Sequence, residues 1–115
     1  MSATLPYVNA FAREMERKLA ENRDKGDRAG WAEMSPWELV ALLLNEVREL
    51  QDALTQADFL EIDSGPEALN AANAAIRSEC ADVANFAMMV ADVAGKMQPC
   101  DCGAYGHSIL CKVKP

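Results

Sequence analysis

Residues 39–54, LVALLLNEVRELQDAL, combine the spacing of an amphipathic helix with a carboxylate at the centre of its apolar face. At about 100° per residue, several apolar side chains lie within roughly 60° of Glu46: Leu39, Leu42, Leu43, Leu50 and Ala53. Glu49 lies to one side of the same face, one turn further on. Burial of an isolated carboxylate is strongly unfavourable, so Glu46 needs a partner that this helix does not supply.

The stretch 76–93, IRSECADVANFAMMVADV, repeats this arrangement. Glu79 lies among apolar residues at helical spacing, and Asp82 lies to one side as Glu49 does. Packing the two faces together would gather four carboxylates with no internal cation. A divalent metal is the economical partner, because carboxylate oxygens suit Mg²⁺, Mn²⁺ or Ca²⁺. Ordinary solvated acid pairs are the alternative interpretation, since the chain has 18 acidic residues.

Composition and net charge limit the fold class and the kinds of partner that this chain can have. Only 6% of the 115 residues are aromatic, while Ala, Leu and Met are plentiful, which favours helix over sheet. The net charge of -7 argues against nucleic acid or an anionic membrane as a partner, because both require a basic face. The sequence shows neither a membrane-spanning apolar run nor the pattern of a signal peptide. We therefore expect an all-α protein of the cytoplasm.

Helix boundaries follow from periodicity and capping signals. An amphipathic helix is expected over residues 7–24, followed by a loop over 25–35. The run SPWE that begins at Ser35 matches a capping box, so the next helix should continue from there to about residue 57.

A further helical pattern covers residues 66–95. Its N-cap is expected at Ser64 or Gly65, and Gly95 fits a C-terminal stop. An unbroken helix of this extent would be about 45 Å long, which is long for a small domain. We therefore expect a break near residues 70–73.

The loop over 25–35 gathers two cations and an aromatic ring: Lys25, Arg28 and Trp31. Cations beside an aromatic ring suit a phosphorylated ligand that carries a flat base. The alternative is a solvated loop whose Trp covers the core.

Residues 98–115 form a tail after the predicted domain 1–97. Its spacing C-x-C-x4-H-x3-C offers four ligands for Zn²⁺: Cys100, Cys102, His107 and Cys111. Three thiols and one imidazole make a tetrahedral zinc set, and a small structural zinc site is one interpretation. The alternatives are an ordinary tail with reduced thiols, or a disulfide from Cys111 to one of the other two cysteines, which would be unusual in the cytosol.

The two acid pairs together resemble a known signature. Glu46-x-x-Glu49 and Glu79-x-x-Asp82 resemble the E-x-x-E … E-x-x-D motif of MazG-like nucleotide pyrophosphohydrolases, members of the all-alpha NTP pyrophosphatase superfamily. The resemblance covers roughly residues 11–96 and extends to the runs SPWELVALLLNEVREL and ECADVANFAMMVADV.

The resemblance implies a helical bundle of about three to four helices per chain, completed by homo-oligomerisation as a homodimer or homotetramer. It implies Mg²⁺-dependent hydrolysis of a nucleoside or deoxynucleoside triphosphate to the monophosphate and pyrophosphate, with Mn²⁺ as a substitute metal. The implied metal ligands are Glu46, Glu49, Glu79 and Asp82. Trp31 resembles a base-contacting Trp, and the remaining implied contacts to phosphate, ligand or metal-bound water are Lys25, Arg28 and Asn85.

Glu49 is our candidate for the catalytic group that orients the attacking water or accepts its proton. Two departures from the family pattern are present: Asn45 stands where many members have a further Glu, and the spacer between Glu49 and Glu79 is long. Three other functions remain open. One is the hydrolysis of phosphoribosyl-ATP, and another is a non-enzymatic helical interaction module with a metal-binding tail. The third is a thiol or zinc redox sensor that uses the cysteines of the tail.

Overall fold

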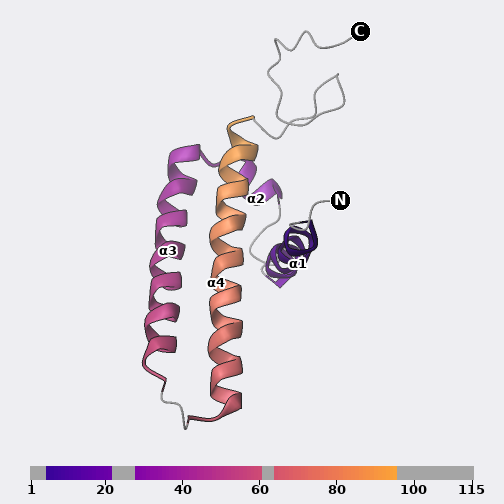
Figure 1. The fold of residues 1–115 in the computed structure, drawn as a ribbon. Coiled ribbons are helices and arrows are strands. Elements are labelled where there is room, and N and C mark those ends of the chain that lie inside the picture. The colour runs from indigo at the N-terminus through magenta and orange to yellow at the C-terminus, as the bar shows by residue number, and fades with distance from the viewer. Residues whose placement is uncertain (1–4, 22–27, 61–63, 96–115) are drawn as a thin grey trace.

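The computed structural model describes residues 5–21, 28–60 and 64–95. These residues form four α-helices and contain no strand: α1 (Leu5–Glu21), α2 (Arg28–Ala32), α3 (Pro36–Asp58) and α4 (Pro66–Val93) (Figure 1). The prediction of an all-α fold with three to four helices is confirmed. The loop expected over 25–35 is partly wrong, because the short helix α2 lies inside it.

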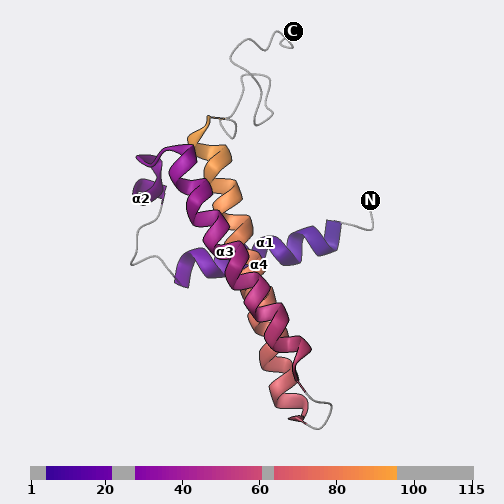
Figure 2. The ribbon, with the colours of Figure 1, turned by 90° about the vertical axis from the view of Figure 1, so that its left-hand side faces the viewer.

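Two long helices dominate the arrangement. α3 and α4 lie side by side as an antiparallel pair and make the most extensive contact between helices (Figure 1). α1 crosses this pair steeply and packs against α4 near the middle of that helix (Figure 2). α2 contacts α4 near its C-terminal end. Helix α4 is therefore the one element that touches the three others.

The capping box at the start of α3 is confirmed. The Ser35 hydroxyl accepts a hydrogen bond from the backbone N–H of Glu38 at 3.1 Å. The Glu38 carboxylate accepts one from the backbone N–H of Ser35, also at 3.1 Å. Pro36 follows in the first turn, where a missing N–H has no cost. These local bonds fix where α3 begins.

The ends of α4 are set by two glycines, but the break expected near residues 70–73 is wrong. Gly65 is the N-cap with φ 97°, and Gly95 follows the helix with φ 79°, a backbone conformation that favours glycine. Between them α4 is continuous. The segment AANAA has high helix propensity, and an exposed Asn costs only a fraction of a kcal/mol. Packing along α3 is enough to keep the helix intact.

This arrangement encloses very little core. Among the described residues only Leu39, Ala81 and Asn85 are buried. Many large apolar side chains are exposed instead: Leu5, Tyr7, Val8, Phe11, Trp37, Leu42, Leu44, Leu54, Phe59 and Leu69. Within the described part of the chain, no helix has the length and apolar character needed to cross a membrane.

Candidate metal centre

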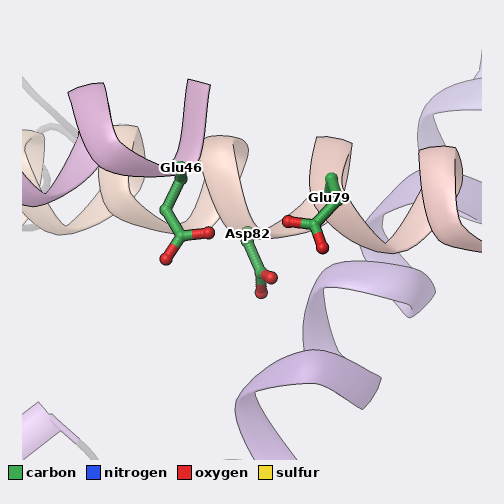
Figure 3. Close-up of side chains that lie close together, drawn as sticks. All are labelled: Glu46, Glu79 and Asp82. Atoms are coloured by element: carbon green, nitrogen blue, oxygen red, sulfur yellow. The ribbon is translucent and has the colours of Figure 1, made fainter. Parts of the chain in front are cut away.

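Three of the four predicted metal ligands meet at the contact between α3 and α4. Glu46 comes from α3, and Glu79 and Asp82 come from α4, with carboxylate oxygens that all lie within 4.8 Å of one another. Figure 3 shows the three carboxylates pointing to the same side of the helix pair. Residues three apart on a helix are neighbours on one face, so their spacing on α4 explains why Glu79 and Asp82 lie together. The pairing of α3 with α4 then brings Glu46 beside them.

The packing leaves oxygen atoms of this cluster buried without partners. The Oε2 atoms of Glu46 and Glu79 are buried and make no hydrogen bond with any described residue. Burial is the main reason that the pKa of Glu46 rises to about 7, with Glu49 and the other two carboxylates adding to the effect. Burial and the neighbouring acids also raise the pKa of Glu79. Burial and mutual repulsion thus make the ionised forms of Glu46 and Glu79 unfavourable in the folded protein.

Glu49 lies at the exposed edge of this cluster. It is not one of the three carboxylates that share the close arrangement, and its side chain is exposed. Its hydrogen bonding and charge nevertheless raise the pKa of both Glu46 and Glu79, so it lies beside them. An exposed carboxylate in this position can contact both water and a ligand bound at the cluster.

The sequence prediction of a cluster with no internal cation is wrong. Lys18 Nζ lies 3.5 Å from Asp82 Oδ2 and 3.3 Å from Glu21 Oε1, and only 11% of the Lys18 side chain is exposed. Burial by itself would lower the pKa of Lys18, but the charges of Asp82 and Glu21 outweigh it and raise the pKa. For Asp82, burial raises the pKa and Lys18 partly opposes that rise.

Lys18 is the functional candidate that sequence reasoning missed. From periodicity, Lys18 was expected among the charged residues away from the apolar face of α1, although it lies three residues after Met15 and residues at that spacing are neighbours on a helix. The contact with α4 depends on how α1 crosses that helix, which no local pattern in the sequence specifies.

Asn85 contacts α1. Its side chain is 3% exposed, and its Nδ2 donates a hydrogen bond to the backbone carbonyl of Met15 at 3.0 Å. Its Oδ1 is buried and accepts no hydrogen bond from a described residue. The amide nitrogen of Asn85 is therefore occupied by α1, and its implied contact to a ligand or metal-bound water stays a prediction.

Trp31 lies away from the carboxylates. Its Nε1 donates a hydrogen bond of 3.0 Å to Asp92 Oδ2 near the end of α4. Asp92 lies ten residues beyond Asp82, which corresponds to about 15 Å along a helix. Arg28 begins α2, whereas Lys25 lies outside the described residues. The four predicted zinc ligands of the tail also lie outside them: Cys100, Cys102, His107 and Cys111.

The cluster fits a hard divalent cation. Mg²⁺ binds oxygen ligands at about 2.1 Å, so two ligands of one ion lie at most about 4.2 Å apart. The carboxylates of Glu46, Glu79 and Asp82 are nearly that close already, within 4.8 Å of one another. Among the described residues, the two buried Oε2 atoms have no hydrogen-bond partner, and Lys18 is the cation paired with the cluster. A divalent cation is one kind of partner that carboxylate oxygens bind.

Comparisons of the chain with protein-family models, curated proteins and solved structures find no match. The features of the molecule that bear on function are the carboxylate cluster and the two acid motifs that supply its members.

Proposed function

We propose that this protein hydrolyses a nucleoside or deoxynucleoside triphosphate to the monophosphate and pyrophosphate, with Mg²⁺ held by Glu46, Glu79 and Asp82. One observation carries the proposal: three partly buried carboxylates from two helices converge, and two of their buried oxygens have no hydrogen-bond partner in the part of the chain that the structure describes. The resemblance of the two acid pairs to MazG-like enzymes supports the same reaction. A phosphorylated substrate also suits the cluster, because its phosphate oxygens can complete the coordination of a shared metal.

Each carboxylate has a role in this proposal. When bound, Mg²⁺ would polarise the attacked phosphoryl group and stabilise pyrophosphate as the leaving group. Glu46, Glu79 and Asp82 hold the ion, and the pairing of α3 with α4 fixes their positions. Glu49, exposed beside them, orients a water molecule and accepts its proton as the water oxygen bonds to the α-phosphorus and the α–β phosphoanhydride bond breaks. The water oxygen stays in the monophosphate, pyrophosphate leaves, and Glu49 releases its proton to solvent.

Product analysis tests this reaction directly. A panel of ribo- and deoxyribonucleoside triphosphates is incubated with wild type, Glu79→Gln and Asp52→Asn, with and without Mg²⁺. Asp52→Asn is the matched control, because it removes an exposed carboxylate from α3 outside the cluster. We expect monophosphate and pyrophosphate from wild type and the control, dependent on metal, and loss of turnover in Glu79→Gln.

The outcomes separate the competing functions. If no triphosphate is cleaved by folded protein in the presence of Mg²⁺, the same assay with phosphoribosyl-ATP tests the nearest alternative. Cleavage of neither substrate would favour a non-enzymatic interaction module. Equal turnover in wild type and Glu79→Gln would contradict the assignment of the cluster as the catalytic site.

We also propose that a second copy of the chain covers part of the exposed apolar surface, in a homodimer or homotetramer. The support is the small core, with only two buried apolar residues among those described, and the apolar side chains exposed on α1 and α3. Light scattering in solution should give a mass above that of one chain. Leu44→Glu, at a position that is 55% exposed, should lower that mass. A monomeric wild type would contradict this proposal.

A further inference from the structure

We propose that Lys18 binds the phosphate oxygens of the metal-bound substrate. The inference rests on the proposed function and assigns a phosphate contact to α1, a helix that carries none of the acid motifs. Lys18 is bound to the cluster through Asp82 at 3.5 Å, whereas the cations first expected to contact phosphate, Lys25 and Arg28, belong to the segment before α3.

Two contacts hold Lys18 at this position. Met15 and Lys18 lie three residues apart on α1, and their partners Asn85 and Asp82 lie three residues apart on α4. Residues at this spacing share a helix face, so one face of α1 is joined to one face of α4 at both points. The buried amide of Asn85 sets the backbone position of α1, and the Lys18 ammonium then reaches the edge of the cluster.

The charges around Lys18 predict how it responds to metal. Its neighbours are Glu21 on α1, together with Asp82 and, through its longer-range charge, Glu79 on α4. A divalent cation on Glu79 and Asp82 would cancel the negative charge that attracts the ammonium and would repel it directly. The flexible four-carbon stem of Lys lets the ammonium turn without moving the helix. Phosphate oxygens on the same metal would then be strong charged acceptors within reach, in competition with the Glu21 carboxylate on α1.

A purely structural role for Lys18 makes a different prediction. If Lys18 only held α1 on α4, its loss would weaken binding of metal and of phosphate together. If Lys18 binds phosphate, its loss removes a cation that competes with the metal and a group that binds phosphate. The affinity for metal then rises or stays the same, while the affinity for phosphate falls.

Calorimetry separates these cases. Mg²⁺ is titrated into metal-free protein, and pyrophosphate, a product of the proposed reaction, is then titrated into the Mg²⁺-saturated protein. For Lys18→Met we expect Mg²⁺ affinity equal to or higher than that of wild type, and pyrophosphate affinity at least tenfold lower. Lys18→Arg should restore most of the pyrophosphate affinity, since guanidinium also binds phosphate. Lys18→Gln serves as the second neutral variant if Lys18→Met does not fold.

Arg17→Gln is the matched control. It removes a positive charge from the neighbouring position of α1, where Arg17 is half exposed and paired with Glu14 and Glu21. It should bind both Mg²⁺ and pyrophosphate as wild type does. Equal pyrophosphate affinity in wild type and the neutral Lys18 variants would overturn the inference, as would a parallel loss of both affinities. Wild type that binds no Mg²⁺ at all would instead overturn the proposed function.

Discussion

The side-chain amide of Asn85 donates a hydrogen bond of 3.0 Å to the backbone carbonyl of Met15, one helical turn from the ion pair between Lys18 and Asp82. Asn85 is one of three buried residues in the described part of the chain, and the only polar one. A buried amide requires hydrogen-bond partners, and α1 supplies one of them only when it crosses α4 at this register. Asn85 thereby couples the position of α1 to the carboxylate cluster.

Replacing Asn85 with Ala should loosen α1 without unfolding the α3–α4 pair. Loss of a buried hydrogen bond costs about 1–3 kcal/mol when one partner is left unsatisfied. Backbone amides of α1 should exchange with solvent faster, while those of α3 exchange at the wild-type rate. Asn73→Ala, on an exposed position of the same helix, is the control and should leave α1 protected. Unchanged protection of α1 in Asn85→Ala would show that this bond does not hold the helix.

Replacing Glu46 with Gln should stabilise the metal-free protein at pH 8. Burial and the adjacent carboxylates raise the pKa of Glu46 from 4.5 to about 7, so its ionisation destabilises the fold progressively between these pH values and fully above about pH 7. We expect Tm to rise by roughly 2–4 °C at pH 8. At pH 4 the group is largely protonated in both the folded and the unfolded state, so the difference should nearly vanish. A lower Tm at pH 8, with Asp52→Asn unchanged, would mean that Glu46 makes a stabilising contact instead.

Metal affinity should depend on pH in the same range. Glu46 must lose its proton to bind a cation, and the folded-state pKa of about 7 lies above its ordinary value of 4.5. The raised pKa of Glu79 acts in the same direction. We expect Mn²⁺ affinity, measured by calorimetry, to fall by up to about tenfold per pH unit below pH 7. An affinity that stays constant from pH 5.5 to 7.5 would exclude Glu46 as a ligand.

Trp31→Phe should weaken the attachment of α2 to α4. The substitution keeps an aromatic ring but removes the Nε1 donor that bonds Asp92 at 3.0 Å. We expect the free energy of unfolding to fall by about 1 kcal/mol. Trp37→Phe is the control, because Trp37 is 82% exposed at the start of α3 and should change stability by less than about 0.5 kcal/mol. Similar effects of the two changes would show that the Trp31 bond contributes nothing.

Local sequence rules account for the helices and for most of the cluster. The capping box at Ser35 depends only on residues within four positions, so it was predicted to the residue. Helical periodicity placed Glu46 and Glu79 among apolar side chains, and helices with apolar faces must pack those faces together. The one wrong helix break followed from weighing length and two Asn residues above the helix propensity of the surrounding Ala.

Contacts between helices far apart in the sequence could not be predicted in this way. The pairing of Lys18 with Asp82 and of Trp31 with Asp92 depends on the crossing of α1 and the placement of α2. Periodicity showed that α1 has an apolar face, but not which turn of α4 it meets. For the same reason Asn85 was expected to face a ligand, although its amide nitrogen bonds α1.

A crystal structure of the protein grown with Mn²⁺ would test the central claim most directly, because anomalous scattering locates this ion without ambiguity. The proposal predicts an anomalous peak bounded by the carboxylates of Glu46, Glu79 and Asp82, with metal–oxygen distances of about 2.0–2.2 Å. The peak should disappear in Glu79→Gln and persist in Asp52→Asn. Ordered wild-type carboxylates with no peak between them, at a saturating Mn²⁺ concentration, would contradict the claim.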